Sequence, residues 1–214
     1  MTFLERVISL LEQEYGALEW QPRSDPTAEL IRGVLSQNTS DVNSDRAFAQ
    51  LRAAFGSWEQ VANAGVDEIA GAIRIGGLNR VKAKRLKSIL TRIRQERGSL
   101  DVRFLQELPL EQARAWLRGL PGVGPKTAAV VLLFSLGMPA LPVDTHVYRV
   151  SKRLGLIPPG VSSEKAHELL EQIVPPQRRY QFHINVLRLG RTVCKANRPL
   201  HHDCILQDIC PKIM

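Results

Sequence analysis

Apolar residues recur every three to four positions along most of the chain, which is the spacing that gives a helix one apolar face. The pattern predicts helices over residues 3–14, 27–37, 45–56, 66–75, 81–96 and 110–120. Residues 127–137 are apolar on every side, as expected of a helix at the centre of a domain. The sequence lacks convincing alternation of period two, so we predict an all-α fold.

Two helical domains are predicted from an interruption late in the chain. The segment from Met138 to Asp144 contains two prolines, which cannot continue a helix. We therefore assign residues 20–137 to a six-helix domain, and residues 1–19 together with 138–214 to a second helical domain. Helix starts are marked at Asp25, which precedes a proline, and at Ser162.

The sequence Leu-Pro-Gly-Val-Gly-Pro-Lys-Thr at residues 120–127 predicts a tight turn between two helices. Gly122 and Gly124 permit a turn that larger side chains would obstruct, and they leave backbone N–H groups open to an anion. Pro125 suits the first position of a helix, which places Lys126 and Thr127 in its first turn. Because the amino end of a helix carries partial positive charge, the turn is predicted to bind phosphate and to favour a neutral amine nearby.

The composition of the chain indicates the kind of partner and the compartment to expect. The net charge of +8 and the isoelectric point near 9.8 favour a polyanionic partner. No apolar run is long enough to span a bilayer, and the amphipathic, acid-containing start of the chain argues against a signal peptide. We therefore expect a cytoplasmic protein, associated with the nucleoid of a bacterium.

The three cysteines, Cys194, Cys204 and Cys210, all fall within the last 21 residues. A disulfide framework needs an even number of cysteines and an oxidising compartment. An odd, clustered set in a cytoplasmic protein favours metal ligation instead. The second domain is therefore predicted to end in a metal-binding loop.

Lys126 and Asp144 stand eighteen residues apart, and each alone has a plain structural interpretation. Lys126 suits a phosphate contact or a solvated charge, and Asp144 suits the N-cap of the helix that follows it. Together they suit a different chemistry. An amine attacks the anomeric C1′ carbon of a nucleotide only when it is deprotonated, and a carboxylate stabilises the positive charge that develops.

The segment Leu120–Val150 resembles the helix-hairpin-helix, Gly/Pro-rich loop and aspartate of the endonuclease III family of DNA glycosylases. The resemblance extends through residues 35–41 and 75–83 to the cysteine tail. It implies that Lys126 is the catalytic lysine and Asp144 the catalytic aspartate. The implied enzyme is a bifunctional base-excision-repair DNA glycosylase with AP lyase activity, which removes oxidised pyrimidines and nicks the strand by β-elimination.

The resemblance also implies contacts with double-stranded DNA that contains damaged bases or abasic sites. The hairpin N–H groups would contact phosphates without reading bases, aided by a monovalent cation. The residues assigned to this grip are Gly122, Val123, Gly124 and Thr127. The implied protein acts as a monomer.

Opening a duplex requires a side chain that fills the gap left by the extruded base. The family's wedge glutamine falls on Asn38, and a glutamine stands one place earlier, at Gln37, so either residue is a candidate for entering the duplex. Leu78 is the candidate for a second wedge. A core position at the start of the next helix is an equal interpretation of Leu78.

The cysteine tail keeps every interval of the family's four-cysteine iron–sulfur loop, with His201 where the second cysteine would stand. The resemblance thus implies a [4Fe–4S] cluster on Cys194, His201, Cys204 and Cys210. Zinc is the alternative, because three thiolates and an imidazole also suit a tetrahedral site. His202 is adjacent and is the competing candidate for the fourth ligand.

Two further functions remain open from the sequence. The same mechanism could act on another lesion, such as 8-oxoguanine or a mismatched base, since the residues that select a base are scattered over several helices. Alternatively, the chain could be a non-catalytic helix-hairpin-helix module that only grips DNA. That module gives no reason for Lys126 and Asp144 to stand at the family's interval.

Overall fold

The computed structural model describes residues 1–213 and contains α-helices and short 3-10 helices but, over that range, no β-strand. The all-α prediction is therefore confirmed. The chain divides into two compact units, one formed by Pro22–Met138 and the other by Met1–Gln21 with Pro139–Met214. Among the described residues, no helix is both long enough and apolar enough to cross a membrane.

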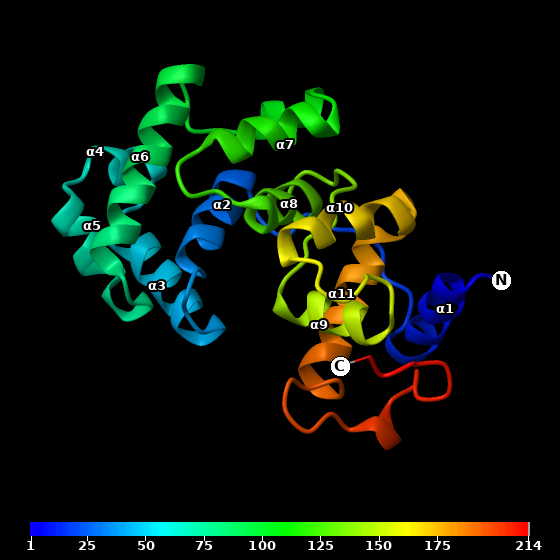
Figure 1. Ribbon diagram of the computed structural model, residues 1–214. Coiled ribbons are helices and arrows are strands. Elements are labelled where there is room, and N and C mark those ends of the chain that lie inside the picture. The colour runs from blue at the N-terminus through cyan, green and yellow to red at the C-terminus, as the bar shows by residue number, and fades with distance from the viewer. Residues whose placement is uncertain (214) are drawn as a thin grey trace. The chain divides into compact units, whose positions relative to one another are not determined.

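The Pro22–Met138 unit consists of successive helices joined by short connections (Figure 1). These are α2 (Pro26–Leu35), α3 (Asp41–Ala54), α4 (Trp58–Asn63), α5 (Val66–Ala72), η1 (Arg74–Gly76), α6 (Asn79–Arg97), η2 (Arg103–Glu107), α7 (Leu110–Gly119) and α8 (Pro125–Phe134). All the helices predicted for this region are present, and α4 is additional. A helix of six residues makes fewer than two turns, so it carries no readable periodicity.

Helix α8 lies at the centre of this unit, as its uniformly apolar sequence predicts. Eight of its ten residues are buried. It packs against α2, where Gly33 faces Thr127 so closely that a Cβ atom on residue 33 would lie 2.6 Å from the Thr127 methyl carbon. The absence of a side chain at Gly33 therefore sets how closely these two helices approach.

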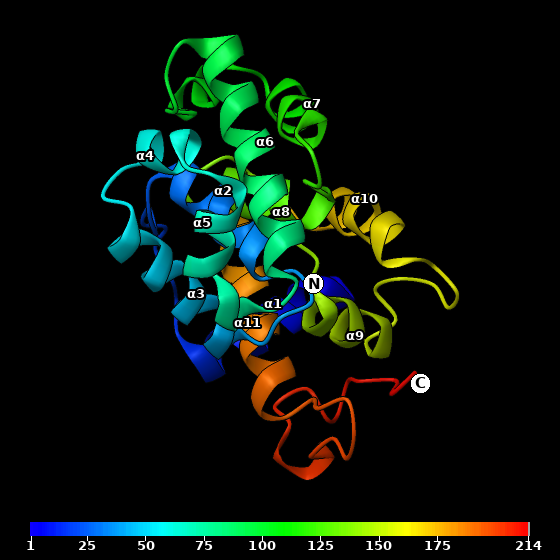
Figure 2. The ribbon, with the colours of Figure 1, turned by 90° about the vertical axis from the view of Figure 1, so that its left-hand side faces the viewer.

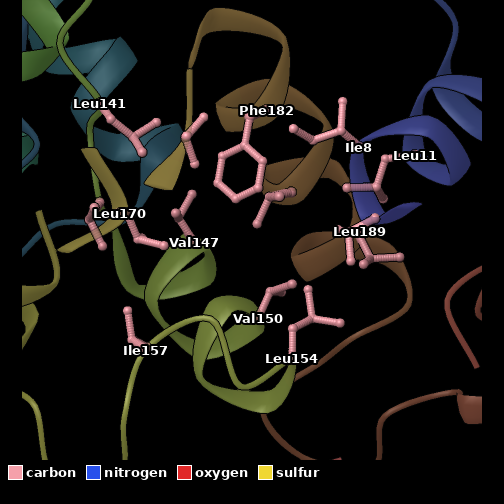
Figure 3. Close-up of a cluster of buried hydrophobic side chains, with 14 of the residues drawn as sticks. Ile8, Leu11, Leu141, Val147, Val150, Leu154, Ile157, Leu170, Phe182 and Leu189 are labelled. Carbon is pink, nitrogen blue, oxygen red and sulfur yellow. The ribbon is translucent and has the colours of Figure 1, made fainter. Parts of the chain in front are cut away.

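The second unit contains α1 (Phe3–Tyr15), α9 (Thr145–Arg153), α10 (Ser163–Ile173), η3 (Pro176–Arg178), α11 (Arg179–Thr192) and η4 (His201–Asp203). Its core joins both ends of the chain. Leu11 from α1, Val147 and Val150 from α9, Leu170 from α10 and Phe182 from α11 meet there with exposures of 1% or less (Figure 3). Burial of this apolar surface fixes α9, and with it the segment that leads into α9.

Side chains cap the helices at the positions where the sequence predicts their starts. The Asp25 side chain accepts from Ala28 N at 3.0 Å, and the Ser162 side chain accepts from Lys165 N at 3.2 Å. At the beginning of α1, Thr2 and Glu5 form a reciprocal capping box. Each cap satisfies N–H groups that have no partner within the helix.

The cysteine-bearing tail follows α11 and, apart from η4, has no regular secondary structure over residues 193–213. It lies beyond the carboxyl end of α11, in orange to red, in both ribbon views (Figure 2). Its cysteines are partly buried against the core of the same unit. The tail is thus packed against the rest of its unit through the residues predicted to bind a metal.

Candidate active site and DNA-facing segments

The turn between α7 and α8 presents backbone to solvent. Gly122 has φ +72°, a left-handed conformation that favours glycine, and it is exposed. Val123 is buried and its N–H donates to Leu120 O at 3.2 Å, which holds the turn against the unit. A Cβ atom on Gly124 would meet nothing within 4 Å. The turn therefore has an anchored centre at Val123, an exposed Gly122 and open space beside Gly124, as the predicted phosphate grip requires.

Lys126 and Thr127 occupy the first turn of α8 in different environments. Lys126 is half-buried, whereas Thr127 is 4% exposed and packs against Gly33. The Thr127 side chain is part of the α2–α8 packing, so the predicted contact of Thr127 with DNA is left to its backbone N–H group. The N-cap residue Gly124 has no side chain to cap the helix, so the N–H groups of Lys126 and Thr127 remain suited to an anion.

Gln37 and Asn38, the two wedge candidates, have different surroundings. Gln37 is held within the protein: its Nε2 donates to Gly122 O at 3.0 Å, and its Oε1 accepts from the Arg85 guanidinium. Asn38 is exposed and has φ +53°. Asparagine adopts this left-handed conformation more readily than most residues. The geometry assigns Gln37 to the support of the hairpin turn and leaves Asn38 at the tip of its segment.

Leu78 stands at the tip of a second segment, between η1 and α6. It is 56% exposed with φ +46°, so the interpretation as a core residue is wrong. For a leucine this left-handed conformation costs about 1–2 kcal/mol. Asn79 anchors the start of α6 by donating to Ala70 O at 3.0 Å. A strained, exposed apolar side chain held on an anchored helix start fits a residue that contacts a partner.

Sequence reasoning missed two residues that support these tips. They are Lys82 and Arg85 of α6: Lys82 is 2% exposed, and Arg85 lies against Gly122. Burial, followed by the nearby charge of Arg85, lowers the pKa of the Lys82 ammonium below its usual value. The sequence did contain a sign of this burial, because Lys82 lies at helical spacing from the apolar Leu86 and Ile89, on the same face of α6.

Asp144 is the N-cap of α9 in the second unit, which confirms its structural interpretation. Its Oδ1 accepts from His146 N at 2.9 Å and from Val147 N at 2.7 Å. Both bonds use the same oxygen, so Oδ2 is not needed by the cap. The carboxylate is half-buried at the amino end of a helix, where negative charge is stabilised.

Polar side chains of the second unit hold the extended segment that precedes Asp144. His167 Nδ1 donates to Leu141 O at 3.1 Å, and His183 Nδ1 donates to Pro142 O at 2.8 Å. Leu141 N donates to Glu171 Oε1 at 2.7 Å. This segment belongs to no helix or strand, so these bonds satisfy its backbone N–H and C=O groups. They also fix the position of the Asp144 backbone.

The four predicted metal ligands line one cavity of about 160 Å³ in the cysteine tail. Within residues 1–213, no three His, Cys, Asp or Glu side chains converge tightly enough to hold a single metal ion. Burial, with smaller contributions from the neighbouring thiols, raises the pKa of the Cys204 thiol. His202 does not line the cavity; it is exposed, with Nε2 3.3 Å from Asp203 Oδ1.

Helix α9 also holds the start of this tail, at Cys194 and Lys195. Arg149 Nε donates to Cys194 O at 3.0 Å. Arg153 Nη1 donates to Lys195 O at 2.7 Å and lies 3.3 Å from Cys194 Sγ. The helix that Asp144 caps therefore carries the guanidinium groups that fix the position of the first thiol.

Comparisons with known proteins place these features in a family context. The model of the HhH-GPD superfamily base excision DNA repair proteins matches residues 31–176. Endonuclease III of Escherichia coli strain K12 is 34% identical over 188 residues, which cover 87% of this chain and 84% of that protein. A protein of Arabidopsis thaliana, provisionally described as a DNA glycosylase, is 39% identical over 170 residues; the match covers 78% of this chain and 58% of that longer protein.

A solved structure of a non-covalent endonuclease III–DNA complex is similar over nearly the whole chain. The TM-score is 0.83 at 28% sequence identity, and the alignment covers 99% of this chain and 96% of that one.

Proposed function

Because this chain is a base-excision-repair DNA glycosylase of the endonuclease III family, within the HhH-GPD superfamily, we propose that it also acts as an AP lyase through Lys126. The observation that carries the proposal is the position of Lys126. Its amine belongs to the first turn of a helix that begins directly after an exposed glycine turn, so a phosphate grip and a nucleophile share one element.

Lys126 uses the lone pair of its Nζ to attack C1′ of the damaged nucleotide. The bond between C1′ and the base breaks, and its electrons leave with the base. The sugar ring opens to give a Schiff base between Nζ and C1′. Loss of a proton from C2′ then expels the 3′ phosphate, which nicks the strand by β-elimination.

Lys82 is a competing amine, and its surroundings argue against it. Its low exposure keeps DNA away, and its three ammonium hydrogens are directed at oxygens of Leu35, Thr39 and Gly76. A nucleophile needs a free lone pair and access to the reacting carbon. The half-buried Lys126 meets the second requirement.

Asp144 is proposed to stabilise the positive charge that develops on the sugar and to accept a proton from the attacking amine. Support comes from the family's interval between lysine and aspartate, and from the free capacity of Oδ2 while Oδ1 caps α9. The cap and the bonds to the segment from Pro139 to Val143 hold the carboxyl group in the structure without DNA.

The grip on DNA is assigned to the backbone of the hairpin turn. Phosphates would accept from N–H groups at Gly122 and Gly124 and from those of Lys126 and Thr127 at the start of α8. A monovalent cation bound to hairpin carbonyls would add positive charge at the same place. Such contacts do not read bases, so they hold any duplex in register for repair.

Asn38 and Leu78 are proposed to fill the gap in the base stack when the damaged nucleotide leaves the duplex. Both are exposed, and both have the left-handed backbone that ends a segment in a sharp tip. Asn38 has a shorter side chain than the family's glutamine at this position. Gln37, by contrast, is bonded to Gly122 O and to the Arg85 guanidinium.

The cysteine tail fits a [4Fe–4S] cluster held by Cys194, His201, Cys204 and Cys210. A cavity surrounded by all four side chains suits a group larger than one ion, which favours the cluster over zinc. When bound, the cluster would cross-link the tail; the glycosylase and lyase steps need no electron transfer. Arg153, whose Nη1 lies beside Cys194 Sγ, would hold that ligand in place.

The substrate class we propose is oxidised pyrimidine in duplex DNA, with 8-oxoguanine and mismatched bases as the alternatives. The test is a panel of duplex oligonucleotides, each with one defined lesion, in which base release and strand cleavage are scored separately. The proposal predicts release of oxidised pyrimidines coupled to cleavage. Release without cleavage would overturn the lyase assignment, and neither reaction on any lesion would favour a module that only binds DNA.

A further inference from the structure

Lys82 is a buried charged residue that the proposed chemistry does not use. It lies in the first turns of α6 and is 2% exposed. Its Nζ donates to Leu35 O at 2.7 Å, to Gly76 O at 2.8 Å and to Thr39 Oγ1. All three donors of the ammonium are thereby satisfied, and none of the three acceptors is a carboxylate.

The three acceptors flank the two tips. Leu35 is the last residue of α2, just before the Gln37–Asn38 tip, and Thr39 follows Asn38 directly. Gly76 ends η1, two residues before Leu78. The Thr39 hydroxyl closes the arrangement by donating to Gly76 O at 2.6 Å. One ammonium group and one hydroxyl therefore join two segments that come from different helices.

A buried lysine is energetically unfavourable at this position. Burying an ammonium carries a large desolvation penalty, and a methionine of similar length would pack without that penalty. The cost is partly offset because Leu35 O and Gly76 O lie at carboxyl ends of helical segments, where positive charge is stabilised. Three directed bonds are the property that an apolar side chain cannot supply.

We infer that Lys82 is a positioning residue that fixes the Asn38 tip and the Leu78 tip relative to each other, so that both enter the duplex at one base step. This inference rests on the proposed function, because it assigns a role in opening duplex DNA. Lys82 does not touch DNA or the reacting atoms; it acts through the backbone on either side of Asn38 and before Leu78.

The strain in the two tips supports this role. A non-glycine residue stays in the left-handed region only when its surroundings determine its backbone. Around Asn38 and Leu78 those surroundings include Leu35, Thr39 and Gly76, the acceptors of Lys82. Without the ammonium, each tip would relax independently, and a displacement of about 1 Å in a positioning group is enough to lower a rate about 100-fold.

Two substrates separate this role from general stability. A duplex with an oxidised pyrimidine must be opened, whereas a single-stranded oligonucleotide with an abasic site needs no wedge. For Lys82→Met we expect single-turnover base release from the duplex to fall about 10- to 100-fold, while borohydride trapping on the single strand stays within about threefold. Lys84→Met is the matched control, since it removes an exposed charge from the same helix and should change both reactions by one common factor.

Equal losses on both substrates, or no loss on the duplex, would overturn the inference. If Lys82→Met does not fold, two substitutions of Thr39 test the inference instead. Thr39→Val removes the hydroxyl that joins Lys82 to Gly76 and should reduce duplex base release selectively, whereas Thr39→Ser keeps the hydroxyl and should restore it. A Thr39→Val variant as active as Thr39→Ser on the duplex would refute the role of this brace. Wild-type protein that forms no adduct on an abasic site in either the single strand or a duplex would instead refute the proposed lyase function.

Discussion

Asp144 combines two roles that a pair of substitutions can separate. As an N-cap it accepts two backbone bonds through Oδ1, and asparagine offers an equivalent oxygen for the same bonds. Alanine offers none. We therefore expect Asp144→Ala to lose about 1 kcal/mol of stability and Asp144→Asn to lose only a few tenths. For a chain of this size, 1 kcal/mol corresponds to a fall of about 2–4 °C in Tm.

Catalysis should not distinguish the two variants. Asparagine carries no negative charge and cannot accept the amine proton, so both variants should lose base excision by about 100- to 1000-fold. The assay pairs thermal unfolding by circular dichroism with single-turnover base release from a duplex that contains one oxidised pyrimidine. An Asp144→Asn protein that unfolds as early as the alanine variant would refute the cap energetics. One that excises bases at the wild-type rate would refute the catalytic role of the carboxylate.

Two other predictions concern packing and the metal loop. Gly33→Ala should destabilise the protein by about 1–3 kcal/mol in urea, because its Cβ would lie 2.6 Å from the Thr127 methyl carbon. Gly71→Ala, a helix position with no atom within 4 Å of an added Cβ, should be neutral or stabilising, and equal losses in both variants would contradict the packing argument. His201→Ala should lower the iron bound per protein, whereas His202→Ala should not, since only His201 lines the cavity. Iron and zinc analysis of the purified proteins measures this, and an unchanged iron content in His201→Ala would exclude that residue as a ligand.

The sequence was sufficient for the features that depend on local pattern. Periodicity located the long helices, and the Gly-Val-Gly-Pro run located an exposed turn followed by a helix start, because only glycine and proline make that turn readily. The cap at Asp144 followed from one residue type before a helix. The spacing of Cys194, His201, Cys204 and Cys210 predicted a common site, and all four side chains line one cavity.

The residues that local pattern misjudged depend on packing between distant segments. The burial of the Thr127 side chain depends on Gly33, 94 positions earlier, so the sequence around Thr127 does not show it. The burial of Lys82 is not evident from its neighbours in the sequence, because its acceptors lie 47, 43 and 6 residues away along the chain. Our proposal of Asn38 rather than Gln37 as the wedge rests on the hydrogen bonds of Gln37 to Gly122 O and to Arg85, which no spacing rule reports.

The central claim is that the amine of Lys126 forms the covalent link to DNA. The direct test is borohydride reduction of the protein with duplex DNA that contains an abasic site, followed by protease digestion and mass spectrometry of the DNA-linked peptide. The account predicts one adduct, on Lys126, and none with Lys126→Ala. An adduct on another amine, or undiminished trapping by the Lys126→Ala variant, would contradict it.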